Sequence, residues 1–166
     1  EEFMKIEENP SGKYVLMNNI SLEQVRLPEG QTSYITKPFT GELYGNNQVV
    51  HGLRAAMFNE VSGKVHELRV QNVFVTAEGT NPANGFARTL NGATIEKVVM
   101  DYVQINGGSY TAALAGTATN KAVIHQIWLE NIQVNALLTE TYKFNFVGGA
   151  VGQMTGASNL EDVYIS

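Results

Sequence analysis

The pair His66–Glu67 has the residue types that most directly suggest metal chemistry, because it opens the H-E-x-x-H zinc motif. That motif needs a second histidine four residues after the first, so that both imidazoles lie on one helical face and bind one ion. Val70 stands at that position here. The chain has 3 histidines and no cysteine. We therefore predict no catalytic residue and no metal ligand in this sequence.

The residues around this pair belong to a repeat. Valine recurs through 65–75, and β-branched side chains favour strands over helices. The same spacing of apolar residues starts again at Ile95 and Ile124, and in part at Leu160, with intervals of 30, 29 and 36 residues. The longer third interval matches an insertion around 137–145. The three complete apolar sets are Val65/Leu68/Val70/Val73/Val75, Ile95/Val98/Met100/Val103/Ile105 and Ile124/Ile127/Leu129/Ile132/Val134.

This spacing predicts the fold. Apolar residues two apart share one face of a strand, whereas a step of three breaks the alternation and marks a bend. Such a unit cannot bury its apolar face alone, so successive units must stack around a shared core. The Val- and Ile-rich repeat favours a β-helix over a leucine-rich repeat, whose period is roughly 20 to 29 residues. We predict an all-β, right-handed parallel β-helix (solenoid) of about five to six turns, with the hand set by the crossover preference of parallel strands.

We expect one β-helix domain over residues 1–166, with excursion loops at about 23–38 and 137–145. A chain of 166 residues with 43% hydrophobic residues can build one sizeable core. The net charge of −5 argues against a nucleic-acid partner. No apolar run is long enough for a transmembrane segment. The first residues are strand-like and the last repeat stops at Ser166 before its template is complete, so we expect a fragment of a longer protein.

Two stretches resemble a known family. "ENPSGKYVLMNNISL", from Glu8, and "FTGELYGNNQVVHGLRAAMFNEVSGKVHELRVQNV", from Phe39, are similar to successive turns of a non-catalytic region in the streptococcal immunoglobulin A protease family of surface zinc metalloproteases. The resemblance covers nearly the whole chain, although the later repeats are less specific. In that family the catalytic zinc site lies in a separate C-terminal domain, and no part of it matches here.

The resemblance implies a non-catalytic scaffold or interaction module of a secreted, cell-wall-associated protease that cleaves host immunoglobulin A. The implied partners are the protease domain of the same chain, which would hold the zinc, and host immunoglobulin A. It implies no cofactor in this fragment.

A carbohydrate-binding or carbohydrate-active β-helix is the alternative. Such enzymes need clustered carboxylates, but Asp101 and Asp162 are the only aspartates and occupy different positions of the repeat. One outward column is expected to contain His66, Glu96, His125 and Glu161. We interpret it as a solvated stripe, because two histidines two turns apart, at roughly 9.6 Å by strand spacing, cannot share one metal.

A second outward column is the candidate partner-binding surface. It takes one residue from each repeat: Arg69, Val99, Trp128 and Tyr164. Exposed aromatic side chains in a row suggest a contact surface, since Trp and Tyr are common binding hot spots. The alternative is that the insertion at 137–145 packs over them. The next outward column, Phe74, Gln104 and Gln133, is mostly polar.

One corner of the repeat is expected to be structural. Asn72 and Asn131 share this position, with Tyr102 between them and Asp162 placed near it in the last copy. Asparagine tolerates the left-handed backbone that a tight corner requires.

Overall fold

The computed structural model describes residues 2–137 and 145–166. The secondary structure of these residues is a short 3₁₀ helix, η1 (Phe3–Glu7), and strands in three sheets. The long sheet contains β1 (Lys13–Val15), β2 (Ile20–Ser21), β4 (Glu42–Tyr44), β5 (Val49–Leu53), β7 (Lys64–Thr76), β9 (Thr94–Gly107), β12 (Val123–Ala136) and β15 (Asn159–Ile165). The second sheet contains β3 (Ser33–Ile35), β6 (Ala56–Val61), β8 (Ala87–Asn91), β11 (Ala115–Thr119) and β14 (Val151–Met154), and the third pairs β10 (Thr111–Ala112) with β13 (Val147–Gly148).

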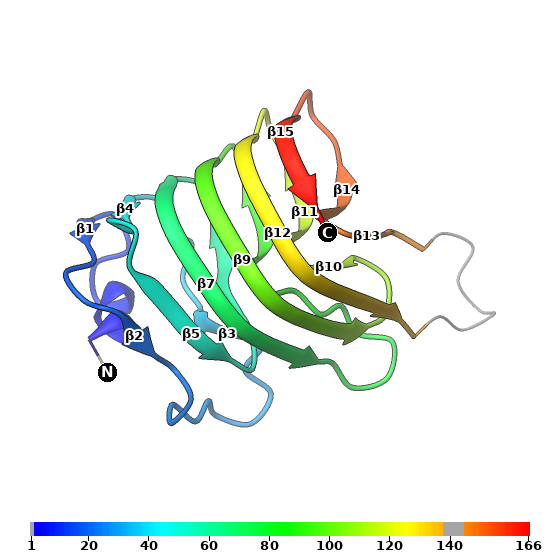
Figure 1. The fold of residues 1–166 in the computed structure, drawn as a ribbon, viewed down its shortest axis with the longest axis horizontal. Helices are drawn as coiled ribbons and strands as arrows, with labels where there is room; N and C mark the ends of the chain where they lie inside the picture. The colour runs from blue at the N-terminus through cyan, green and yellow to red at the C-terminus, as the bar shows by residue number, and fades with distance from the viewer. Residues whose placement is uncertain (1, 138–144) are drawn as a thin grey trace.

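All strand pairs in these sheets are parallel, which confirms the all-β, parallel part of the prediction. The long sheet has the order β1-β4-β7-β9-β12-β15, and the second has the order β14-β11-β8-β6-β3. Figure 1 shows the long strands β7, β9 and β12 side by side, with shorter strands behind them. Each complete repeat thus adds one strand to each of these two sheets.

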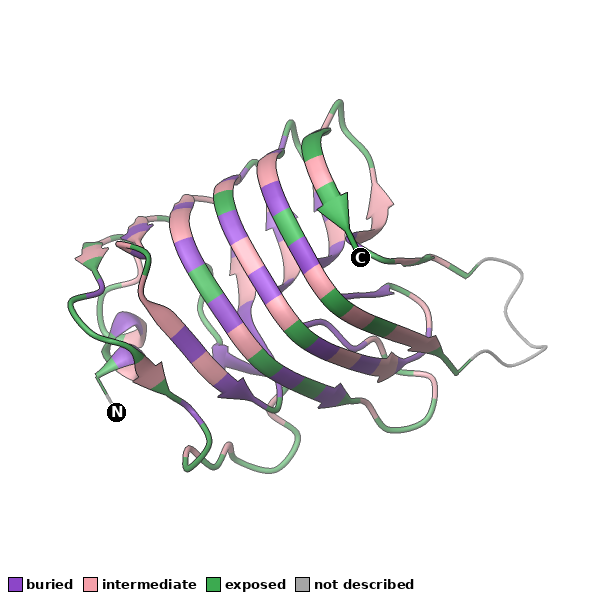
Figure 2. Cartoon of the chain, in the orientation of Figure 1, coloured by how far each residue is buried: buried purple, intermediate pink, exposed green. Residues whose placement is uncertain are grey.

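The strand register confirms the repeat alignment. Val70 pairs with Met100, and Met100 pairs with Leu129. The apolar positions of β7 and β9 are buried throughout, and outward positions alternate with them along each strand (Figure 2). The core therefore lies between the long sheet and the second sheet. A row of aromatic rings runs through it, with centroids 5.3 Å apart from Phe39 to Phe58 and 5.6 Å from Phe58 to Phe86.

Each step of three residues contains one left-handed residue. In β7 these are Glu67 (φ 53) and Asn72 (φ 55), and the equivalent residues of the later repeats are also left-handed. A single left-handed residue bends the strand and absorbs the extra position, so that the next apolar side chain still points inward. The prediction for Asp162 was wrong. Counted from Leu160, it is equivalent to Glu67 and belongs to the first bend, because the last repeat ends before the second.

The N-terminal segment also differs from the prediction. Residues 3–7 form a 3₁₀ helix, not a strand, and bury Phe3 and Ile6 against the first turns of the stack. The Glu7 carboxylate accepts hydrogen bonds from the backbone N–H groups of Thr36 and Lys37. Burial acts to raise the pKa of Glu7, but these N–H groups lower it below its usual value. The helix is therefore tied to the chain that follows β3.

The two predicted excursions have different outcomes. The segment 23–38 contains β3, which pairs with β6 in the second sheet, so part of it belongs to the regular stack. Its Tyr34 and Ile35 side chains are fully buried. Most of the insertion predicted at 137–145 lies outside the described residues.

Within the described residues, no helix has the length and apolarity needed to cross a membrane.

Candidate partner-binding surface

The four residues of the candidate column lie in register on adjacent strands. Arg69 of β7 pairs with Val99 of β9, Val99 pairs with Trp128 of β12, and Trp128 pairs with Tyr164 of β15. Trp128 is 42% exposed and Tyr164 is 54% exposed. Their direction follows from the pleat, because Ile127 and Leu129 on either side of Trp128 are fully buried. The column is thus a row on the outer face, and its role in binding a partner stays a prediction.

Two other outward aromatic residues of the long sheet have a cation or a ring against them from within the chain, although Phe74 remains 43% exposed. The guanidinium carbon of Arg54 lies 5.1 Å from the ring centroid of Phe74. The ring of Tyr44 stacks on His66 with a centroid distance of 5.0 Å and an interplanar angle of 8°. In the described part of the chain, no ring and no cationic group lies over Trp128 or Tyr164. Among the described residues, these two exposed side chains therefore have no aromatic or cationic partner.

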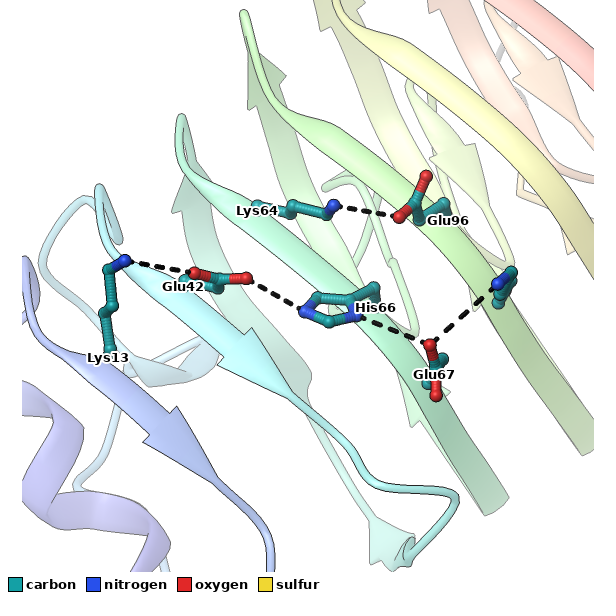
Figure 3. Close-up of polar contacts among 7 residues, drawn as sticks. Lys13, Glu42, Lys64, His66, Glu67 and Glu96 are labelled. Carbon is teal, nitrogen blue, oxygen red and sulfur yellow. Dashed lines mark hydrogen bonds and ion pairs between the residues drawn. The ribbon is translucent and has the colours of Figure 1, made fainter.

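The outer face nearer the N-terminus carries a row of alternating acidic and basic side chains (Figure 3). Glu42 lies 3.6 Å from the Lys13 ammonium and 3.1 Å from Nε2 of His66. On its other side, His66 lies 3.9 Å from Glu67, whose carboxylate is 3.9 Å from the Lys97 ammonium. Opposite charges on neighbouring strands stabilise a sheet modestly, so this part of the face is satisfied internally.

A second ion pair joins Lys64 to Glu96 at 2.9 Å (Figure 3). The hydrogen bond to Glu96 raises the pKa of Lys64, and the same bond lowers the pKa of Glu96. Both side chains are partly exposed, at 41% for Lys64 and 29% for Glu96, so the pair contributes modestly to stability.

The predicted histidine–glutamate column exists as a register, but the histidine side chains contact other residues. In the backbone register, His66 lies opposite Glu96 of β9, and His125 of β12 lies opposite Glu96 on one side and Glu161 of β15 on the other. However, Nε2 of His66 contacts Glu42, and Nε2 of His125 lies 3.2 Å from Asp162. No group of three or more His, Asp or Glu residues in the described part of the chain is arranged to hold a metal ion.

The comparison with known families decides the family of the chain. Residues 3–87, slightly more than half of the sequence, match the model described as M26 IgA1-specific Metallo-endopeptidase N-terminal region. The chain belongs to this family. The matched residues span η1 to the start of β8 and contain both stretches that carried the resemblance. The family prediction is therefore confirmed.

Similar proteins extend the match over nearly the whole chain. The zinc metalloprotease ZmpC of Streptococcus pneumoniae serotype 4 is 28% identical over 159 residues, covering 93% of this chain. The immunoglobulin A1 protease of Streptococcus sanguinis is 31% identical over 163 residues, covering 95%. An immunoglobulin A1 protease of Streptococcus pneumoniae strain R6 is 30% identical over 157 residues. The chain spans only 8% of the length of each of these relatives.

Proposed function

We propose that the chain is a non-catalytic scaffold and interaction module of a secreted, cell-wall-associated zinc metallo-endopeptidase that cleaves immunoglobulin A1. The zinc ion and its ligands belong to the catalytic domain of the parent protease. The module either docks that domain or holds the substrate. Membership of the M26 N-terminal region family and the similarity to zinc metalloproteases and immunoglobulin A1 proteases support this proposal.

The architecture suits such a module. We infer that the parallel sheets are the faces of a right-handed β-helix of about five to six turns, in agreement with the crossover preference of parallel strands. The in-register pairing of β7, β9, β12 and β15 supports this inference, because each strand repeats the position of the previous one. A stack of this kind presents outward columns on a rigid frame, which suits contact with another protein.

The observation that carries the interaction role is the exposed pair Trp128 and Tyr164, which have no ring or cation partner among the described residues. Apolar rings that stay in contact with water are costly, whereas a partner that covers them gains their burial. Aromatic side chains of this kind supply a large share of the binding energy in protein interfaces.

The test is a titration of the ¹⁵N-labelled chain with immunoglobulin A1 and, separately, with the catalytic region of the parent protease. We expect one partner to shift the backbone resonances of β9, β12 and β15, and the chain alone to cleave nothing. Trp128→Ala should weaken this binding by about 1 to 4 kcal/mol. Gln133→Ala, a matched control on the same strand, should leave it unchanged. Shifts confined to the second sheet, or equal affinity of both variants, would exclude the column. A glycan that shifted these resonances when neither protein did would support the carbohydrate-binding alternative.

A further inference from the structure

Two carboxylates lie beside the aromatic column. Asp101 of β9 pairs in register with Glu130 of β12, and each stands two residues after the column residue of its own strand, Val99 or Trp128. Residues two apart on a strand point to the same face, and neighbouring strands are about 4.8 Å apart. The outer face therefore has two neighbouring rows, one of Val99 and Trp128 and one of Asp101 and Glu130. Tyr164 lies next to Trp128 in the first row. We call these five residues the aromatic–acidic face.

The negative charges of this face have no ion-pair partner in the part of the chain that the structure describes. Like charges directly opposite on neighbouring strands destabilise a sheet. Asp101 accepts a hydrogen bond of 2.8 Å from Nδ2 of Asn131. In the described part of the chain, however, neither Asp101 nor Glu130 forms an ion pair. Arg69, the cation of the same column, is exposed and also forms none. A positively charged partner group would relieve the repulsion between the two carboxylates.

The chain itself shows which group suits an aromatic ring on this sheet. Phe74, an outward residue of β7, has the Arg54 guanidinium over its ring. An arginine side chain can stack on an aromatic ring and form paired hydrogen bonds with a carboxylate at the same time, which the compact ammonium of lysine cannot do. Trp128 offers the ring that binds cations best, and Glu130 and Asp101 offer carboxylates on the same face.

From these three observations we propose that the aromatic–acidic face binds an arginine side chain of a protein partner. The guanidinium lies over the Trp128 indole and donates hydrogen bonds to the carboxylates of Glu130 and Asp101, while Tyr164 lies on the other side of Trp128. This inference rests on the proposed interaction function and deepens it, because it names the chemistry by which the partner is recognised.

Trp128 is the only tryptophan of the chain, so its fluorescence and its indole N–H resonance report on this face alone. The probes are blocked peptides with two arginines in a glycine–serine background, and the same peptides with lysine or glutamine in place of arginine. We expect the arginine peptide to shift the Trp128 signals and to bind about two- to fivefold more tightly than the lysine peptide, as a cation–π contact at an exposed site allows. The glutamine peptide should not bind.

The carboxylates are tested by Glu130→Gln and Asp101→Asn, which keep size and shape. Each substitution should weaken binding of the arginine peptide about two- to fivefold, which is the effect of losing one exposed charge pair. Glu161→Gln is the matched control: it removes the same charge from an exposed residue of β15 in another outward column. Circular dichroism and a thermal melt of each variant check the fold.

Three results would overturn the inference: no change in the Trp128 signals, equal binding of arginine and lysine peptides, or equal losses in Glu130→Gln and Glu161→Gln. The outcome is separable from that of the proposed function. If a protein partner binds through Trp128 but arginine peptides do not compete with it, the arginine inference fails and the module role stands. If arginine peptides bind but neither protein partner does, the module role fails.

Discussion

Replacing Leu129 with alanine tests the repeat register and the position of the core together. Leu129 is fully buried and lies between Met100 of β9 and Ile165 of β15. The substitution removes three carbon atoms, which corresponds to about 2.4 kcal/mol of lost transfer free energy at about 0.8 kcal/mol for each. The residual cavity adds to this loss, and buried Leu→Ala substitutions as a group cost about 2 to 5 kcal/mol. Because Ile165 on one side is 48% exposed, the site has room to relax, and we expect about 2.5 to 3.5 kcal/mol.

The measurement is urea unfolding followed by circular dichroism, with the free energy of unfolding extrapolated to water. The control is Gln133→Ala on the same strand, an exposed outward residue that should cost less than about 0.5 kcal/mol. An unchanged m-value in both variants would show that the two-state comparison holds. Similar losses in the two variants would refute the assigned inward and outward positions, because only a buried side chain can leave a cavity.

Three further predictions follow from the structure. Lys64 lowers the pKa of Glu96 in the folded state. The Glu96 carboxylate therefore stabilises the fold at pH values above its unfolded pKa of about 4.5, and this contribution is lost as the pH falls through the lower folded pKa. The difference in melting temperature between the wild type and Glu96→Gln should therefore shrink from about pH 6 to about pH 3. Gly63→Ala should destabilise the chain by more than about 1 kcal/mol in the same urea assay, since the new Cβ would lie 2.0 Å from the Gly41 carbonyl oxygen. Gly149→Ala is the control and should cost less, because its Cβ meets only a side chain, at 3.3 Å. Zinc or calcium should leave the melting temperature unchanged, because an ion that bound the folded state would raise it.

The inward positions of the repeat could be predicted from the sequence because they obey a simple periodic rule. A template of apolar residues fixes which side chains share a face, and a left-handed residue in each step of three keeps that rule intact across the bends. The register of Val70, Met100 and Leu129 needed no other information. Asp162 was misplaced although the sequence gives its position: it follows Leu160 by two residues, as Glu67 follows Val65, and so belongs to the first bend.

Side-chain partners on the outer face could not be predicted in the same way. Glu96, next to His66 in the register, binds Lys64, while His66 contacts Glu42 on its other side. The side-chain rotamer decides which of several equally near neighbours a residue contacts, and the sequence does not specify rotamers. The short η1 helix was missed for a different reason: five residues give too little periodicity to separate a helical turn from a strand.

The fold depends on the inward positions of the strands, whereas the proposed recognition would use the outward ones. Each inward residue packs against its equivalents in the repeats before and after it, so an inward change affects several strands at once. An outward residue has only to be compatible with solvent and with the side chains next to it. The N-terminal strands use that freedom for charge pairs and for aromatic rings covered from within the chain, such as Tyr44 on His66. On β9, β12 and β15, Asp101 and Glu130 have no ion pair, and Trp128 and Tyr164 have no ring or cation against them, among the residues that the structure describes. Because the inward pattern is the same in both parts, the demands of the fold do not account for this difference, and it is the reason for which we propose a partner at this face.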